Sequence, residues 1–437
     1  MFKRLFTMFK TLISYLIHYL KRHSHELSFI LFLFLLQFVV ILPVLFWNKP
    51  WTIFFKGFPS KANYTMEESN LNTKRLSKAV EYFHSIDAKA SLKLYDDAIK
   101  NNVGEIDMVV SIVTTKRKNS KITKNSLGYL LQSSAKVDKL VKHQTNFKSV
   151  FTTICNVDVK PEEHHDAISL KSYLPYVERY GNSKPSIPDL FLPQSNVTYR
   201  TNTPVRTFEK ETMDYIFCLN AAKYWNPKYV LLLEDDGIVH DNVMDILAYV
   251  LKYRLGNFSR YGAKDFIHLK LFYPEKWQGY AFEKDRILEL LSGGLVGGAI
   301  FILVYLLCNI KRRKHSLALI FTCGVLFTVL TCVVLGRQNI IELRRIHPCT
   351  YRFVSSPGCC TPAMLYPSSV IDELSKSLSR DASKPYLRTD LAINQFVQSS
   401  GLPAFYIEPN LVDHIGRVTT LGLADKPADQ FLQQIDI

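Results

Sequence analysis

Three long apolar stretches divide the chain. They cover residues 27–46, 290–310 and 317–335. Each is long enough to cross a bilayer as a helix, which takes about 20 residues. Only a short basic connector, residues 311–315, lies between the second and third stretches. The pattern therefore predicts one transmembrane anchor followed, much later in the chain, by a tight transmembrane hairpin.

Basic residues predict the orientation of these helices. Lys and Arg in short loops mark the cytoplasmic side of a membrane, and they occur both in the connector and ahead of the first stretch. The N-terminus and the connector are thus expected in the cytosol, with residues 48–289 and 336–437 on the lumenal side. No small-residue cleavage site follows residues 27–46, so we interpret this stretch as an anchor and not as a cleaved signal peptide.

Between the anchor and the hairpin, buried-strand patterns alternate with helical ones. Such alternation predicts an α/β domain with a parallel sheet, preceded by a helical stem or docking pair. The expected strands lie within residues 107–115, 149–156, 229–234 and 266–272, and the expected helices within residues 126–141, 209–224 and 242–255.

The roughly hundred residues after the hairpin lack the alternating pattern of an independent core. We expect them to complete the first domain, so that the hairpin interrupts it. The resulting organisation has a cytoplasmic tail, an anchor, a lumenal stem, a first domain part, the hairpin and a second domain part. The corresponding ranges are 1–26, 27–46, 47–105, 106–289, 290–335 and 336–437.

The run LLLEDDGIVH, residues 231–240, ends a predicted buried strand in three consecutive acids, Glu234, Asp235 and Asp236. Crowded carboxylates repel one another, and hard oxygen ligands suit Mg²⁺ or Mn²⁺. In open α/β sheets, ligands also bind beyond the carboxyl ends of the strands. The alternative is a solvated acidic turn before a helix that Asp241 caps. The spacing alone leaves both interpretations open.

Net charge and cysteines bear on partners and compartment. The chain carries +15, but its densest basic clusters flank apolar stretches, where anionic lipid headgroups explain them. No basic-aromatic nucleic-acid module is visible, so the expected partner is membrane lipid and not nucleic acid. Asn63, Asn196 and Asn257 begin glycosylation sequons in the predicted lumenal part.

Five cysteines lie in the predicted lumenal part, where disulfides persist. Cys155 and Cys218 fall on adjacent predicted core elements and are the expected pair. Cys359 and Cys360 either form a vicinal disulfide or pair separately.

Five sequence blocks together resemble one family, the post-GPI-attachment N-acetylgalactosamine transferases. The blocks are YVLLLEDD (229–236), HLKLFYPEKWQ (268–278), GRQNIIELRR (336–345), CCTPAMLYP (359–367) and YIEPNLVDHIG (406–416). The resemblance implies a Golgi membrane enzyme with three membrane helices and a Rossmann-type GT-A domain that a transmembrane hairpin splits. Its implied reaction transfers GalNAc from UDP-GalNAc to a mannose of the glycosylphosphatidylinositol (GPI) glycan of anchored proteins.

The resemblance also implies roles for residues of the acid cluster. Such a motif holds a divalent metal, usually Mn²⁺, with Asp236 in direct contact and Glu234 and Asp235 reaching the ribose and the metal's water ligands. His414 resembles a late histidine that completes the metal site, although a lone His is more often structural. Thr115 and Arg117 end the first strand, where this fold receives uracil and ribose; the alternative is an ordinary basic turn.

The implied reaction inverts the anomeric carbon, which requires a carboxylate to accept the proton of the acceptor hydroxyl. Asp390, at a predicted helix start, is the preferred base, and Glu275 is the second candidate. Asp390 would otherwise be a helix cap, and Glu275 would otherwise pair with a lysine.

Two rival functions stay open. A branching N-acetylglucosaminyltransferase of N-glycans shares the late histidine pattern, but a single anchor is typical of that class. A non-catalytic lumenal protein that binds GPI glycans would keep the fold without metal-dependent turnover.

Overall fold

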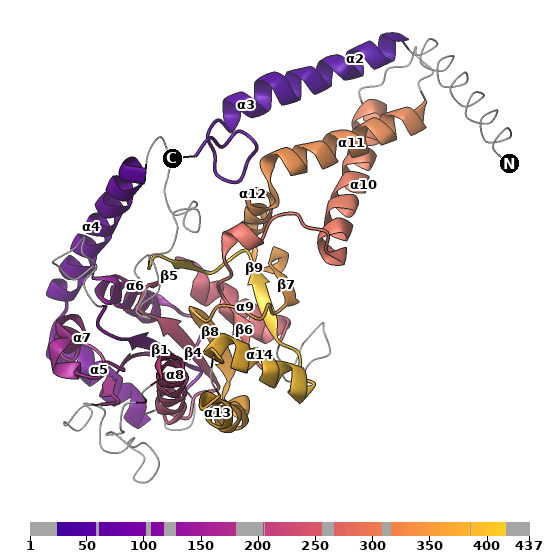
Figure 1. Ribbon diagram of the computed structural model, residues 1–437. Coiled ribbons are helices and arrows are strands. Elements are labelled where there is room, and N and C mark those ends of the chain that lie inside the picture. The colour runs from indigo at the N-terminus through magenta and orange to yellow at the C-terminus, as the bar shows by residue number, and fades with distance from the viewer. Residues whose placement is uncertain are drawn as a thin grey trace. The chain divides into compact units, whose positions relative to one another are not determined.

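A computed structural model describes residues 24–57, 61–101, 106–117, 128–180, 204, 206–255, 266–307, 316–384 and 386–416. The chain divides into two compact units. The first unit comprises Met1–Gly57 and Gln278–Ile340, and the second comprises Phe58–Trp277 and Ile341–Asp436. The second unit therefore draws on chain from both sides of the apolar hairpin (Figure 1).

The first unit contains the hairpin helices α10 (Lys284–Leu307) and α11 (Leu317–Leu335). Both are long and apolar enough to cross a membrane, with mean hydropathies of 2.3 and 2.6. Small residues allow close packing, because a Cβ added to Gly297 would lie 1.9 Å from Oγ1 of Thr328. Helix α10 begins six residues before the expected 290, since its first turns carry polar side chains such as Glu289.

Helical residues also cover the expected anchor. Helix α2 (Ser24–Leu35), the π-helical η1 (Leu36–Ile41) and α3 (Leu42–Leu45) follow one another directly. The apolar part of this run, Leu31–Leu45, is shorter than either hairpin helix. Phe34 and Phe38 contact Phe327 of α11 edge-to-face, with ring centres 5.2 and 5.7 Å away.

An ion pair closes the polar end of the hairpin. Arg337, which is 2% exposed, follows α11, and its Nη2 lies 2.8 Å from Oε2 of Glu289 on α10. Nη1 of the same guanidinium donates to the carbonyl of Gln278 at 2.9 Å. Partners on both sides compensate the desolvation of the buried guanidinium.

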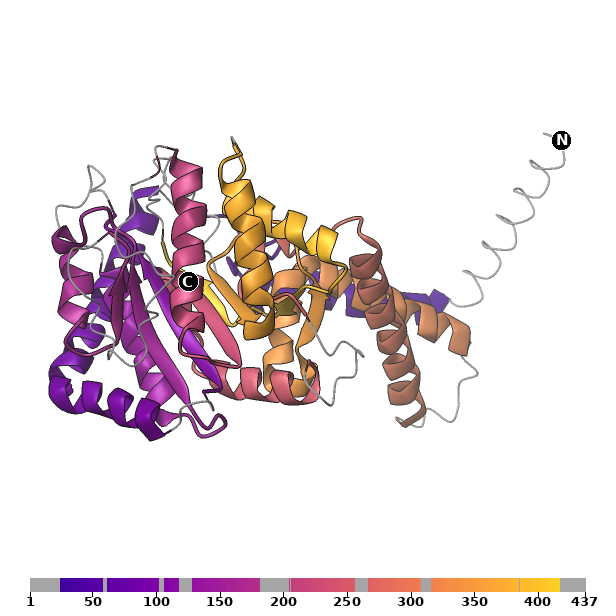
Figure 2. The ribbon, with the colours of Figure 1, turned by 90° about the horizontal axis from the view of Figure 1, so that it is seen from below.

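An eight-stranded sheet forms the centre of the second unit, in the order β3-β2-β1-β4-β8-β6-β9-β7. The first four strands are parallel (Figure 2), whereas β8 is antiparallel to both its neighbours and β7 is antiparallel to β9. The strands are β1 (Met108–Thr114), β2 (Val150–Asn156), β3 (Tyr176–Glu178), β4 (Tyr229–Glu234), β6 (Leu269–Lys270), β7 (Arg352–Ser355), β8 (Ala363–Pro367) and β9 (Phe405–Glu408).

The α/β class expected from the pattern is confirmed, but the sheet is mixed and not wholly parallel. Strands β1 and β2 are buried along almost their whole length, as parallel strands covered on both faces require. Strand β8, from beyond the hairpin, lies between β4 and β6 at the middle of the sheet. The expected strand at 266–272 is reduced to the two residues of β6, paired on both sides.

Helices cover the sheet. Helix α8 packs with α13 and α14 and against β1 and β4, whereas α6 packs against β2 and α4 (Figure 1). The helices are α4 (Lys61–Ser85), α5 (Ala88–Asn101), α6 (Tyr129–His143), α7 (His165–Leu170), α8 (Thr207–Lys223), α9 (Val243–Tyr253), α12 (Arg337–Glu342), α13 (Ser368–Ala382) and α14 (Thr389–Ser400).

A disulfide and a buried carboxylate fix helices to this core. The expected disulfide is present and joins Cys155 of β2 to Cys218 of α8. Asp138 of α6 is fully buried and accepts hydrogen bonds from the hydroxyls of Tyr82 (2.8 Å) and Tyr95 (2.6 Å). These tyrosines belong to α4 and α5, so the helices that precede the sheet pack on it.

Candidate active site

The acid cluster lies where β4 ends. The chain turns after Glu234 into β5 (Gly237–Val239), which pairs in antiparallel fashion with β10 (Val412–His414). In this two-stranded ribbon His414 lies opposite Gly237. The ribbon therefore brings the late histidine to the acids, although a long stretch of sequence separates them.

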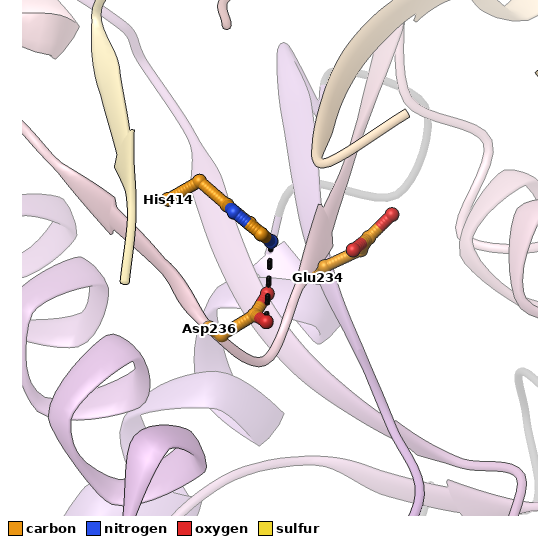
Figure 3. A group of neighbouring side chains, drawn as sticks. All are labelled: Glu234, Asp236 and His414. Carbon is orange, nitrogen blue, oxygen red and sulfur yellow. Dashed lines mark ion pairs between the residues drawn. The ribbon is translucent and has the colours of Figure 1, made fainter. Parts of the chain in front are cut away.

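Glu234, Asp236 and His414 form a candidate metal centre (Figure 3). Each offers one ligand atom, and these atoms all lie within 4.8 Å of one another. Nε2 of His414 is 3.2 Å from Oδ2 of Asp236, and the two residues are only 6% and 1% exposed. Carboxylate oxygens with one imidazole nitrogen fit Mn²⁺ or a similar divalent cation.

The backbone after His414 also approaches the acids closely. The amide of Ile415 donates to the carbonyl of Asp236 at 2.9 Å. A Cβ on Gly416 would lie 1.6 Å from Oδ2 of Asp236. Glycine is thus required at position 416 for the ribbon to close over the carboxylate.

The alternative of a solvated acidic turn is wrong, because Asp235 and Asp236 are 6% and 1% exposed. Nor does Asp241 act as the helix cap: the N-cap residue of α9 is Asn242, and the Asp241 carboxylate instead pairs with Lys136.

Arg117 is the positive charge of this cluster. Its guanidinium pairs with Asp235 and lies 2.7 Å from Oδ2 of Asp236. Burial by itself lowers the pKa of Arg117, but the two carboxylates outweigh burial and raise that pKa. A cation bound by Asp236 would therefore compete with this guanidinium for the same oxygen.

Thr114 and His164 extend the network around Asp235 and were not singled out from the sequence. The Thr114 hydroxyl donates to Oδ2 of Asp235 at 2.7 Å and lies 2.8 Å from Nε2 of His164. Because that hydroxyl proton is used by Asp235, its oxygen accepts from Nε2–H of His164. Burial lowers the pKa of His164, which favours the neutral ring.

Thr115, expected at the nucleoside, hydrogen-bonds to an acid that was not singled out from the sequence, Asp158. Its hydroxyl donates to Oδ2 of Asp158 at 3.1 Å, and the Lys116 amide donates to the same oxygen at 2.9 Å. Asp158 follows β2, at the same sheet edge as Glu234. Its position two residues after a buried strand was the sequence signal that could have identified it.

Asp390 lies in the first turn of α14. Its Oδ2 accepts from the Cys360 amide at 3.2 Å and its Oδ1 from the Leu391 amide at 2.8 Å. The neighbouring Thr361 hydroxyl donates to Oε1 of Glu234 at 3.1 Å. The loop at 360–361 thus links the preferred base to the acid cluster. Glu275, the second candidate, is 4% exposed and begins the short helix η4 (Glu275–Trp277).

A disulfide at Cys359 and Cys360 is not present: both are free thiols, with Sγ atoms 2.7 Å apart. Adjacent Cα atoms are about 3.8 Å apart, which is shorter than ordinary disulfide geometry prefers. Nζ of the buried Lys270 fixes the loop instead, by donating to the carbonyls of Pro357 (2.6 Å) and Cys359 (2.5 Å).

Glu211 is a further residue that sequence reasoning missed. It lies in the first turns of α8, and burial, followed by the negative charges of Glu234 and Asp390, raises its pKa to about 7. Its only sequence signal is an acid early in the helix that leads to β4, and acids are common at that position.

The sequons add nothing to the site. Asn63 lies on α4, in a part whose side chains are not described, and Asn196 and Asn257 lie outside the described residues.

One family model matches residues 108–413, that of the GPI-N-acetylgalactosamine transferase PGAP4. The match starts with β1, continues on both sides of the hairpin and ends within β10, beside His414. It therefore includes the acid cluster, the loop formed by Cys359, Cys360 and Thr361, and Asp390. Because the match covers well over half of the chain, this protein belongs to the GPI-N-acetylgalactosamine transferase PGAP4 family.

Proposed function

We propose that this protein transfers GalNAc from UDP-GalNAc to a mannose of the GPI-anchor glycan, with inversion at the anomeric carbon and dependence on Mn²⁺ or a similar divalent cation. Membership of the family supports a GPI-glycan GalNAc transferase. The observation that carries the proposal is the convergence of Glu234, Asp236 and His414 beyond the carboxyl end of β4. We further propose that the sheet is of the GT-A type, with diphosphate binding at this edge.

Glu234, Asp236 and His414 would hold the cation. When bound, it would supply positive charge to the diphosphate leaving group. Arg117 lies at the same carboxylates, and a guanidinium is suited to bidentate contact with phosphate oxygens. We assign Arg117 to the diphosphate, Asp235 to the ribose and to holding Arg117 in place, and Thr115 with Asp158 to the nucleoside.

Asp390 is the proposed base. Backbone amides of Cys360 and Leu391 donate one hydrogen bond to each of its carboxylate oxygens. They fix its orientation, and a lone pair on each oxygen stays available for the acceptor hydroxyl proton. Glu275 remains the second candidate, and its burial means that it would act only if substrate reaches it.

We place the protein in the Golgi membrane, with its N-terminus in the cytosol and the domain in the lumen. Two helices of membrane-spanning length support a membrane location. The disulfide between Cys155 and Cys218 supports an oxidising compartment for the domain. Residues 27–46 would act as a third membrane helix.

The test uses the purified full-length chain in detergent, with UDP-GalNAc, MnCl₂ and a GPI glycan. Mass spectrometry should detect addition of one N-acetylhexosamine, and EDTA should abolish it. Turnover of UDP-GlcNAc in preference to UDP-GalNAc would favour the branching N-acetylglucosaminyltransferase. Product formed equally well with EDTA would remove the metal from the proposal.

A non-catalytic GPI-glycan-binding protein is the second candidate. The observation in its favour is that Arg117 already neutralises part of the charge of Asp235 and Asp236 without a metal. This alternative predicts that the glycan binds but that neither UDP-GalNAc hydrolysis nor transfer occurs. Isothermal titration with the glycan, run beside the mass-spectrometric assay, separates the two.

A further inference from the structure

The first turns of α8 and α14 contact each other inside the second unit. The hydroxyl oxygens of Thr212 and Thr389 are buried and lie 3.0 Å apart. Glu211 precedes the first of these threonines, and Asp390 follows the second. The contact therefore joins the helix that carries Glu211 to the helix that carries the proposed base.

The charges of two acids of the proposed reaction centre act on Glu211. After burial, the largest influences on its carboxyl group are the negative charges of Glu234 and Asp390. Helix α8, which carries Glu211, packs against β4, the strand that ends in Glu234, and against α14, which carries Asp390. Arg388 is the cation that opposes them, and its guanidinium also lies 5.3 Å from the ring centre of Phe208.

One oxygen of Glu211 lacks a donor. Its Oε2 is enclosed and forms no hydrogen bond with the residues that the structure describes. A buried carboxylate oxygen without a donor destabilises the folded protein, because the oxygen has lost its hydrogen bonds to water. Native proteins contain few such atoms, and those they contain often serve a function. The nearby carboxylates of Glu234 and Asp390 increase this cost further, because like charges repel.

We propose that Glu211 contacts substrate: its Oε2 accepts a hydrogen bond from a hydroxyl of a hexopyranose at the reaction centre. The new glycosidic bond would form between the diphosphate side, marked by Glu234, and the base, Asp390. A ring at that place has several hydroxyl donors and no negative charge, so it satisfies Oε2 without adding repulsion. The hydroxyl belongs either to the GalNAc of the donor or to the acceptor mannose. This assignment rests on the proposed function.

The first experiment compares Glu211→Ala and Glu211→Gln with the wild-type full-length chain, in detergent with MnCl₂. Glu209→Gln is the matched control, two residues away on the same helix. Loss of a hydrogen bond to a charged group should lower kcat/KM for transfer about 10- to 100-fold in Glu211→Ala. Glu211→Gln should lose less, since its amide oxygen still accepts, and Glu209→Gln should match wild type. Circular dichroism checks that each variant is folded.

Two assays then identify the sugar. If the donor's GalNAc supplies the hydroxyl, hydrolysis of UDP-GalNAc without acceptor falls in Glu211→Ala, and the affinity for UDP alone is unchanged. If the acceptor supplies it, hydrolysis is retained and KM for the glycan rises. Deoxy analogues of each sugar complete a double-mutant cycle. With wild type, kcat/KM should be lower for the analogue that lacks the contacted hydroxyl than for the normal sugar. With Glu211→Ala, the analogue and the normal sugar should give the same kcat/KM.

The proposal is overturned if every deoxy analogue lowers kcat/KM by the same factor with Glu211→Ala as with wild type, because no hydroxyl then depends on this residue. This result holds whether or not the variant is partly misfolded, since the cycle compares substrates within one protein. A wild-type chain that neither hydrolyses nor transfers UDP-GalNAc would instead overturn the proposed function, and this assignment with it.

Discussion

At the scale of single residues, the site is a balance of buried charges. Asp235 and Asp236 share the guanidinium of Arg117, and His414 lies against Asp236. Glu211 has acids around it and one opposing arginine. Substitutions that change charge but not volume can therefore separate the chemistry of the site from its packing.

Asp236→Asn should abolish GalNAc transfer while the protein still folds. The change removes a charge from the proposed cation site and keeps the shape of the side chain. We expect a loss of at least about 100-fold in kcat, measured with UDP-GalNAc and MnCl₂. Asp241→Asn is the control, because its side chain is 85% exposed and lies just after β5. Near-normal activity of Asp236→Asn would refute the assignment of this residue to the metal.

Glu211 should also make stability depend on pH. Its pKa is raised from 4.5 to about 7 in the folded protein, so the folded state holds the proton more tightly than the unfolded state. The contribution of this group to stability is therefore fully present below pH 4.5 and is lost as pH rises through about 7. Glu211→Gln should therefore be more stable than wild type at pH 8. The difference in free energy of unfolding between the variant and wild type should be about 2 kcal/mol larger at pH 8 than at pH 5.

Denaturation curves at the two pH values would measure this difference. Glu209→Gln serves as the control, and its free energy of unfolding relative to wild type should not change as pH rises. If Glu211→Gln differs from wild type in stability by the same amount at pH 5 and pH 8, the raised pKa of Glu211 does not affect stability.

At the scale of elements, two attachments shape the second unit. The ribbon of β5 and β10 brings His414 to the end of β4. The buried carboxylate of Asp138 joins α4 and α5 to α6 through two tyrosine hydroxyls. The first attachment builds the site, whereas the second supports the sheet from outside the site.

Gly416→Ala should impair transfer by displacing the ribbon. A Cβ at this position would meet Oδ2 of Asp236 at 1.6 Å, so either the backbone or the carboxylate has to move. Because a misplacement of about 1 Å can cost 100-fold in rate, we expect a loss of that order in kcat. Gly293→Ala is the control, since nothing lies within 4 Å of its added Cβ. Equal activity of the two variants would show that the close approach does not position Asp236.

Asp138→Ala should destabilise the second unit by about 2–4 kcal/mol. It leaves the hydroxyls of Tyr82 and Tyr95 and the ammonium group of Lys142 without their shared acceptor. Chemical denaturation followed by circular dichroism measures the change, with the exposed Glu81→Ala on α4 as the control. If both variants unfold at the same denaturant concentration, the carboxylate does not hold these helices in place.

At the scale of the whole molecule, a hairpin of two apolar helices long enough to cross a membrane interrupts the chain of the second unit. A single anchor with a flexible linker would suffice for a soluble acceptor. A GPI glycan lies close to the lipid surface, and holding reactants in a productive geometry can supply several kcal/mol of the barrier. We infer that the hairpin serves to place the site at this surface.

Replacing residues 290–335 by a short soluble linker should therefore separate two activities. Metal-dependent hydrolysis of UDP-GalNAc should persist, because β8 and His414 remain in the chain, whereas transfer to GPI-anchored proteins in membranes should fall sharply. Radiolabelled donor measures both. An equal loss of both activities would make the hairpin a structural requirement, and retention of both would show that it does not position the site.

The sequence alone determined which segments are buried and where charge accumulates. Hydrophobic period and length predicted the apolar hairpin, the strands β1, β2 and β4 and most of the helices around them. They also identified Glu234, Asp235 and Asp236 as a group, because three acids in a row after a buried strand need no tertiary information to be recognised. The pairing of Cys155 with Cys218 followed from their places on adjacent core elements.

Only the tertiary structure decided which distant residues meet. Three features leave no mark in local periodicity: the insertion of β8 between β4 and β6, the pairing of Arg117 with the acids and the contact of Thr212 on α8 with Thr389 on α14. A hydrophobic pattern reports that a residue is buried but not what it is buried against. Strand register and helix packing, which sum many weak long-range contacts, select those partners and with them the composition of the site.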